Sequence, residues 1–334
     1  MIRRFVATVA LLAGAALVPA SGAFAQQAPR EVGLGIRLVD APVELRDDPR
    51  AQLYIVDRVQ AGTTITRRVE VSNGTSNPMT PRLYVAAAAI RRGSFTVEQP
   101  SARNEITRWG RISPTSLSLA PGQHAEATVT IEVPEGTPDG EYYGAAVASD
   151  APRDEGGGVA IAAAVGVRIY LSVGKGAVKS DFELTKLTAS RLGDGRPLVT
   201  STVRNTGERA LDMSGDLKLS NGPGGVKGGP FRAEVGTTLG IGDTEDVRVI
   251  LDEDTPAGPW DAVLTLRSGT IERAVKARIT FPDVGGPPED VEFDELEKKR
   301  RFGALAGSLI ILLLAIMAVV AWRVRRARAR EAPT

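Results

Sequence analysis

Short runs in which apolar and polar residues alternate recur along most of the chain, and turn residues separate them. The alternation is clearest in Thr128–Val133 and Asp246–Leu251, and it is typical of strands with one buried face. The predicted strands are Val32–Val39, Thr64–Val71, Arg82–Ile90, Ser116–Leu119, Ala125–Val133, Glu141–Ala148, Val159–Val173, Phe182–Ala189, Leu198–Arg204, Leu211–Leu219, Arg232–Leu239, Asp246–Leu251, Asp261–Leu266 and Glu272–Ile279. About seven short strands in each half are the pattern of a β-sandwich.

The sequence therefore predicts an all-β fold of two tandem Ig-like or fibronectin-III-like β-sandwiches. The first sandwich covers residues 26–175 and the second covers residues 176–283, with the glycine-rich linker Gly174–Gly176 between them. A linker and charged juxtamembrane segment follows over residues 284–302. Helical periodicity outside the chain ends is confined to Glu289–Arg301.

A faint internal repeat supports two similar units. Arg68–Thr75 resembles Ser201–Gly207, and both end in an asparagine turn that needs a positive φ angle. Further on, each half has a Thr-Pro-x-Gly-x motif that leads to an aromatic residue, Tyr142 or Trp260. We expect this aromatic side chain to be pinned to the core in both units.

The N-terminus has the features of a secretory signal peptide over residues 1–25. Arg3 and Arg4 precede the apolar run Phe5–Val18, and the small-residue site Ala23–Ala25 follows. The run is shorter than the roughly 20 apolar residues that span a bilayer, which favours cleavage over a retained anchor.

The C-terminal region predicts one transmembrane helix over residues 303–323. Its core, Ala304–Trp322, has 19 residues and no charge, which corresponds to about 29 Å of helix. A basic cytoplasmic tail is predicted over residues 324–334. Arg323 and four arginines of this tail follow the helix directly, as in a stop-transfer anchor. We therefore expect a single-pass cell-membrane protein with residues 26–302 outside the cell or in the cell-wall space. The basic cluster Lys298–Arg301 on the outer flank is the exception to this charge pattern.

Charge narrows the class of ligand. The chain has 41 basic and 40 acidic residues, but excluding all charged residues of the two ends, Glu331 included, and the basic cluster 298–301 leaves 30 basic and 39 acidic ones. An acidic exterior argues against nucleic acid as a partner. The chain has no cysteine, so each domain has to be stabilised by core burial alone.

The residues that enzymes use are scarce, so we predict no catalytic activity, no cofactor and no metal site. His124 is the single histidine, and it falls in a predicted hairpin turn without a partner for a triad or a zinc site. The spacing of Ser172 and Lys175 matches a serine-enzyme motif, but these residues end a strand and lie in the linker. Gly222–Lys227 lacks the order of a phosphate loop, and Asp252–Asp254 lacks the spacing of a calcium loop.

Exposed aromatic residues next to polar ones are the candidate binding site. Trp109 lies in a loop between Arg108 and Arg111, and Tyr142 and Tyr143 are adjacent on a strand. Neighbouring strand residues face opposite sides, so one tyrosine is expected in the core and the other in solvent. The alternative for Trp109 is that it covers the end of the sandwich.

The first domain resembles the N-terminal, peptidoglycan-binding domain of the WxL-interacting protein family, in an actinobacterial-like, membrane-anchored variant. The resemblance covers roughly residues 33–175 and depends on the order of Ala61–Thr63, Val69–Asn73, Leu119–Gly122, Val133–Pro134, Asp139–Ala146 and Gly166–Leu171. It implies a surface protein that contacts peptidoglycan or another cell-wall glycan through its first domain. Its second domain would bind another cell-surface protein.

A second resemblance, through Asn73, Ser113-Pro114 and Leu117–Gly122, is to periplasmic pilus chaperones. Such a chaperone would need basic side chains in the cleft between its domains, and the spacing of the sequence indicates no such pair. The sequence thus predicts a membrane-anchored glycan-binding surface protein, with an extracytoplasmic assembly scaffold or chaperone-like adaptor as the alternative.

Overall fold

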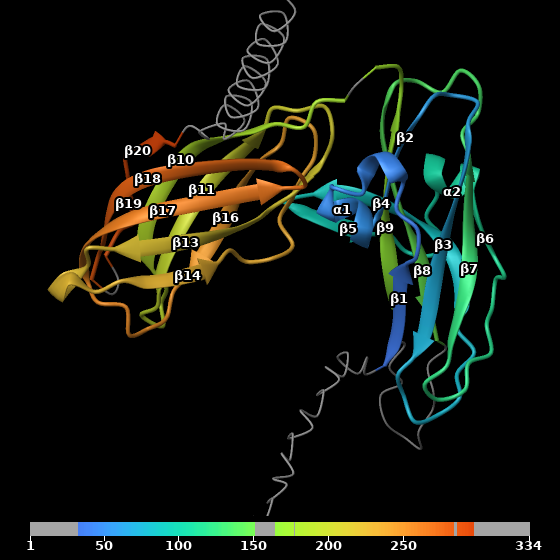
Figure 1. Cartoon of the computed structure of the whole chain (residues 1–334), viewed down its shortest axis with the longest axis horizontal. Coiled ribbons are helices and arrows are strands. Elements are labelled where there is room, and N and C mark those ends of the chain that lie inside the picture. The colour runs from blue at the N-terminus through green and yellow to red at the C-terminus, as the bar shows by residue number, and fades with distance from the viewer. Residues whose placement is uncertain (1–32, 151–163, 177, 284–285, 297–334) are drawn as a thin grey trace, which may run out of the picture.

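The computed structural model describes residues 33–150, 164–176, 178–283 and 286–296 (Figure 1). The predicted signal peptide, transmembrane helix and cytoplasmic tail lie outside these residues. No helix within the described ranges is long and apolar enough to cross a bilayer. The described residues form two β-sandwich domains, residues 33–176 and 178–296, so the all-β prediction is confirmed.

The first domain packs a four-stranded sheet against a five-stranded sheet. The strand orders are β1-β3-β7-β6 and β2-β9-β8-β4-β5, and β2 runs parallel to β9. This arrangement corresponds to the ABED and GFC sheets of an Ig-like sandwich. The elements are β1 (Leu34–Leu38), η1 (Val43–Leu45), α1 (Pro49–Leu53), β2 (Ile55–Val59), β3 (Thr64–Asn73), β4 (Arg82–Arg91), β5 (Ser94–Val97), α2 (Glu105–Trp109), β6 (Gly110–Ser113), β7 (His124–Glu132), β8 (Gly140–Ser149) and β9 (Ala164–Val173).

The second domain has the same two-layer plan. Its sheets have the orders β16-β11-β10-β19 and β14-β13-β17-β18-β20, and a short β12-β15 pair lies at the end that meets the first domain. The elements are β10 (Phe182–Arg191), β11 (Pro197–Asn205), β12 (Leu211–Asp212), β13 (Ser214–Ser220), η2 (Pro223–Gly225), β14 (Gly228–Arg232), β15 (Thr238–Leu239), β16 (Thr244–Ile250), β17 (Gly258–Ser268), β18 (Ile271–Phe281), β19 (Glu289–Asp290) and β20 (Phe293–Glu295).

Alternation along the strands builds both cores. In β7, Val129 and Ile131 are buried while the residues between them are half-exposed, as the pattern predicted. In β16, Val247 and Val249 play the same part. Each domain thus holds its own cluster of buried apolar side chains, which fits a chain that has no disulfides.

The internal repeat forms the same corner twice. Asn73 and Asn205 end equivalent strands and are each 1% exposed. The side-chain amide of Asn73 donates to the carbonyl of Leu119, and that of Asn205 donates to the carbonyl of Leu239.

The segment after the second domain differs from its predicted helical periodicity. Residues 286–296, which we call the strap, are extended instead of helical. Strand β19 pairs with β10 and strand β20 pairs with β18, so the strap joins both sheets along one side of the sandwich. Val291 and Phe293 of the strap pack on the core of the domain, which explains why the segment does not stand free.

Candidate functional site

The structure brings Trp109 and Tyr142 together. Asn104 caps α2 by accepting a hydrogen bond from the backbone N–H of Thr107, and this helix carries Trp109 at its end. The rings of Trp109 and Tyr142 lie 4.9 Å apart with planes at 61°, in an edge-to-face contact. Both rings are half-buried against the first-domain core, so the pair also covers the sandwich, as the alternative for Trp109 proposed.

Tyr142 has a structural role that its counterpart in the second domain repeats. Its hydroxyl donates to the carbonyl of Pro138 at 2.9 Å, and the indole Nε1 of Trp260 donates to the carbonyl of Pro256 at 3.1 Å. In both cases the acceptor is four residues earlier, in the Thr-Pro-x-Gly motif. The expected pinning of the aromatic residue is therefore present in both units.

The two arginines predicted beside Trp109 lie on the surface and are already paired. Arg108 contacts Glu105 at 3.4 Å, and its side chain is 63% exposed. Arg111 contacts Glu132 at 2.5 Å, and its side chain is 60% exposed. Both ion pairs are exposed, so salt screens them. An anionic ligand could bind either arginine only by displacing the glutamate that now pairs with it.

Tyr143 lies on the other face of β8, away from Trp109. The prediction that the two tyrosines face opposite sides is confirmed, but neither is fully buried and neither is fully exposed. The ring of Tyr143 lies 6.0 Å from that of Tyr170 on the neighbouring strand β9. Its hydroxyl donates to the carboxylate of Glu141 at 2.8 Å, and burial together with this carboxylate raises the pKa of Tyr143. Tyr143 therefore belongs to a second, different cluster.

That second cluster joins the two domains. On β9, Val167, Ile169 and Leu171 point into the core, so Arg168 and Tyr170 stand on the outer face of the sheet. This face meets β12 and β15 of the second domain, and in Figure 1 it lies beside α1 and β5 between the two sandwiches. We call the polar side chains at this contact the junction cluster.

Asp212 is the centre of the junction cluster. Its carboxylate accepts hydrogen bonds from Nε of Arg50, Nη1 of Arg168 and the hydroxyl of Tyr170, each at 2.8 Å. A fourth hydrogen bond comes from the hydroxyl of Thr238 at 2.9 Å. Three of these four donors belong to the first domain, so a single carboxylate of the second domain is held by the outer face of the first.

Arg50 is placed by the start of helix α1. Asp48 caps this helix by accepting the backbone N–H of Arg50, and Pro49 occupies its first turn. The guanidinium of Arg50 is 5% exposed, and its Nη1 donates to the carbonyl of Ala210 at 2.8 Å. Burial alone would lower the pKa of Arg50, but the negative charges of Asp212 and its neighbours outweigh burial and raise it.

Further bonds complete the junction cluster. The backbone N–H of Ala210 donates to Glu141 at 2.5 Å, and burial raises the pKa of that carboxyl. Arg209 contacts Asp48 at 3.3 Å, while burial and the nearby Arg50 lower the pKa of Arg209. The cluster thus balances three arginines against three carboxyl groups, as buried charges require.

Sequence reasoning missed this site and wrongly found no basic pair at the domain boundary. Arg50 and Arg168 do lie there, but they come from distant parts of the chain and already hold Asp212. One signal was available, since Arg168 interrupts the apolar run Val167–Leu171. A charged residue on a central strand needs a partner on the outer face of its sheet.

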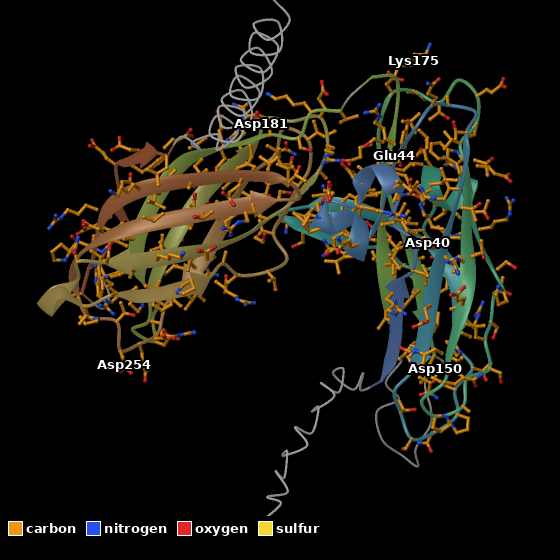
Figure 2. All side chains as sticks on the ribbon, in the orientation of Figure 1. Asp40, Glu44, Asp150, Lys175, Asp181 and Asp254 are labelled. Atoms are coloured by element: carbon orange, nitrogen blue, oxygen red, sulfur yellow. The ribbon has the colours of Figure 1, made fainter. Side chains whose placement is uncertain are left out.

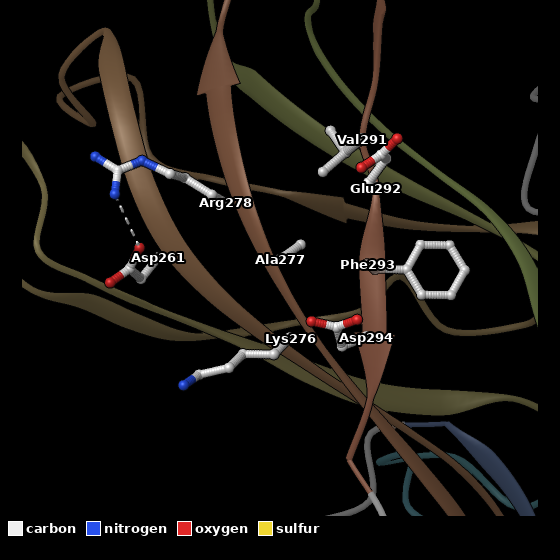
Figure 3. Close-up of a pocket in the computed structure, with 8 residues that line it drawn as sticks. All are labelled: Asp261, Lys276, Ala277, Arg278, Val291, Glu292, Phe293 and Asp294. Atoms are coloured by element: carbon white, nitrogen blue, oxygen red, sulfur yellow. Dashed lines mark ion pairs between the residues drawn. The ribbon is translucent and has the colours of Figure 1, made fainter.

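Three hollows that are lined by described residues are open to solvent. One of about 850 Å³ lies beside the strap and is lined by residues of β17, β18 and the strap, and Figure 3 shows Arg278 of β18 directed to Asp261 of β17. A second, of about 790 Å³, lies between β14 and the turn after β16, and a third, of about 420 Å³, lies at the ends of β2 and β9. These shapes suit macromolecular surfaces better than an enclosed small-molecule site.

The described residues offer no metal centre. No group of three histidine or carboxylate side chains within them could hold a metal ion. His124 begins β7 instead of lying in the predicted turn, and its Nδ1 lies 3.2 Å from Glu70 on the surface. The absence of catalysis and of cofactors stays a prediction.

Comparisons with known proteins show a distant structural likeness. The sequence matches no family model and no curated protein. Among solved structures, the YadV chaperone is 10% identical over 79% of this chain and 100% of its own, with a TM-score of 0.39. The Escherichia coli chaperone DraB is 15% identical over 80% of this chain and 97% of its own (TM-score 0.35), and the SafB chaperone, solved with the Salmonella enterica SafA pilin, is 11% identical over 74% and 97% (TM-score 0.38). Likeness at this level does not establish a shared function, so the function has to be argued from the residues of this chain.

Proposed function

We propose that this chain is a membrane-anchored, non-enzymatic adaptor that binds another protein outside the membrane. The observation that supports this function most is the junction cluster, because it links the two sandwiches through one half-buried carboxylate, that of Asp212. A binding surface of protein size buries about 800 Å² on each partner, and a rigid body loses less entropy when it forms such a contact.

The exposed loops and edge strands of the two sandwiches are the surfaces on which such a partner would dock. Loops on a rigid β scaffold carry binding in many sandwich proteins, and the open hollows of this chain lie among them. The acidic exterior disfavours a polyanion and leaves a protein as the better-matched ligand.

Cross-linking in intact cells tests the adaptor function. Cells that express the full chain are treated with a cross-linker that does not cross the membrane, and we expect one specific protein to be recovered in a fixed ratio to the chain. Asp212→Ala loosens the junction, so it should lower the yield, while the surface variant Asp194→Ala is the control. Recovery of the chain without any specific partner would contradict the adaptor function.

A glycan-binding first domain is the second candidate, and the contact of Trp109 with Tyr142 favours it. Sugars stack on aromatic faces, and this pair is half-buried with Arg108 exposed beside it. It is also the site that the resemblance to the WxL-interacting protein family implies. In a sedimentation assay of the full chain with purified peptidoglycan, this function requires co-sedimentation that Trp109→Ala weakens and moderate salt does not. Arg37→Ala, which changes an equally exposed arginine of the first domain outside this site, serves as the matched surface control.

A further inference from the structure

The second domain closes its two open sides differently. On the side of β10 and β18, the strap pairs with both sheets and covers the core. On the opposite side, β14 is the edge of one sheet and β16 is the edge of the other, and no strand of the described chain bridges them. The hollow of about 790 Å³ lies there, and we call it the distal hollow.

The floor of the distal hollow is apolar and partly exposed. Phe231 and Ile250 are half-buried, and Val226 is 45% exposed at the rim. The buried ring of Trp260 lies beneath them. Exposed apolar side chains that cluster around a hollow mark a contact surface more often than scattered ones do.

Glycines give the hollow a fixed wall. A Cβ atom on Gly222 would lie 2.2 Å from the ring of Trp260, so only glycine lets the backbone pass over the indole. Gly229 has a φ of +87°, and a Cβ atom there would lie 2.6 Å from the carbonyl oxygen of Leu217. The turn that contains Gly222 is thus packed on the core of the second domain, and the hollow is formed before any ligand binds.

The rim carries unpaired charges of both signs. Lys227 and Arg232 come from the β14 side, and Asp252 and Asp254 come from the turn after β16. None of these four exposed side chains makes an ion pair or a side-chain hydrogen bond with the described residues, whereas the neighbouring Arg248 is paired with Glu234. Figure 2 shows Asp254 at the end of the second domain that lies away from the first domain.

We propose that the distal hollow binds an extended segment of a partner protein, in which an apolar side chain is flanked by one basic and one acidic residue. The apolar side chain packs on Phe231 and Val226, the basic residue faces Asp252 and Asp254, and the acidic residue faces Lys227 and Arg232. A polyanion is disfavoured by the two aspartates. Strand addition along β14 is disfavoured because Pro230 has no N–H to donate.

This inference rests on the proposed adaptor function and names the partner segment that it would recognise. The test measures binding of the full chain, in detergent micelles, to short fluorescent peptides by anisotropy. The probes carry a central leucine flanked by glutamate and lysine, in both orders. Comparison peptides carry a central serine, two lysines or two glutamates. We expect at least one mixed-charge leucine peptide to bind about tenfold more tightly than every comparison peptide.

Charge reversal makes the test specific to the distal hollow. The double variant Asp252→Lys with Asp254→Lys should shift the preference about tenfold towards the two-glutamate peptide, and Val226→Ser should weaken all leucine peptides. All three positions are exposed, so folding is preserved. The matched control reverses Lys276→Glu with Asp294→Lys at the hollow beside the strap and should change nothing.

Two results would overturn this inference. One is equal affinity of the chain for all peptides, including no binding of any. The other is a preference that the double aspartate variant leaves unchanged. If either occurs while a specific protein is still cross-linked to the chain in cells, the adaptor function stands and the partner docks elsewhere. If the cross-linked protein is also missing, both proposals fail together.

Discussion

The first and second domains share their corners but use their outer faces differently. Each has a buried asparagine at the end of a strand and an aromatic side chain bonded to the carbonyl four residues earlier. The two domains differ at the position directly before this aromatic residue. Before its aromatic residue the first domain has Glu141, which contacts the second domain, and the second domain has the exposed Pro259.

The difference shows how two sandwiches with the same plan can use their outer faces for different contacts. In the first domain, the outer face of β8 and β9 is committed to the junction cluster. In the second domain, the strap covers one side, and the distal hollow stays open at the far end. The two domains therefore differ in their outer faces and edges, while the shared corners support the same two-layer scaffold in both.

Trp260→Ala should have the largest effect on stability. Trp260 is 2% exposed in the core of the second domain, whereas Tyr142 is half-buried at the rim of the first. Truncation of a buried tryptophan costs about 3–5 kcal/mol. Chemical denaturation of the full chain, followed by far-ultraviolet circular dichroism, should show selective unfolding of the second domain. Tyr142→Ala is the matched variant in the first domain. An equal loss of unfolding free energy from it would contradict the expected difference between the buried Trp260 and the half-buried Tyr142.

Asp212→Ala should come next, because it breaks the link between the domains. Removal of one partner from a buried ion pair leaves the other charges uncompensated and costs about 3 kcal/mol when the site is partly accessible. We expect the single unfolding transition of the parent to separate into two. Asp216→Ala, which removes a more exposed partner of Arg267, is the control and should cost less than about 1 kcal/mol. Two transitions already present in the parent would show that the junction does not couple the domains.

The paired variants Asn73→Ala and Asn205→Ala test the shared corners. Each removes an amide that satisfies buried carbonyls, which costs about 1–3 kcal/mol. If the corners are equivalent, each variant lowers the unfolding free energy of its own domain by a similar amount. Gln60→Ala, which removes an exposed side-chain amide at a turn, is the control. A large loss of unfolding free energy for one variant and none for the other would mean that the two corners do not stabilise their domains equally.

The long strands could be predicted from the sequence, and the short elements could not. Alternation in β7 and β16 covers a full run of residues, so the predicted and observed strands agree within one or two positions. Strands β2, β5 and β6 were missed because four or five residues give too little periodicity. Ser116–Leu119, predicted as a strand, makes only isolated bridges.

The candidate site was predicted only where its residues are close in sequence or share a strand. Trp109 and Tyr142 do meet, and Tyr143 goes to the other face of its strand. The junction cluster lay beyond reach because Arg50 and Asp212 are 162 residues apart. A bond over such a separation depends on how two domains pack, and one sequence contains no spacing that reports it. The strap was misread because Glu289–Arg301 has helical periodicity, yet its apolar residues find more contact as strands against β10 and β18.

The smallest predicted effect is a pH dependence that Glu141 of the junction cluster gives to the first domain. Burial raises the pKa of Glu141, so the folded state binds its proton more tightly than the unfolded chain does. The contribution of Glu141 to the unfolding free energy is therefore fully present below the ordinary pKa of a carboxyl group. It is lost as the pH rises from there to the raised pKa. Asp181, at the start of the second domain, has the opposite sign. Its hydrogen bond from Lys179, with the charge of Arg273, lowers its pKa, so its contribution is lost as the pH falls.

Glu141→Gln separates the two contributions. The glutamine oxygen can still accept the hydrogen bonds from Ala210 and Tyr143, so the junction geometry is kept while the titration is removed. Thermal unfolding of the full chain across the acidic range should show that the variant loses less stability than the parent as the pH rises through this window. Asp181→Asn is the matched variant and should instead remove the loss on acidification. If Glu141→Gln leaves the dependence of stability on pH unchanged, burial at the domain junction does not raise the pKa of Glu141. Glu141 and Pro259 would then differ in their contacts but not in their effect on pH dependence.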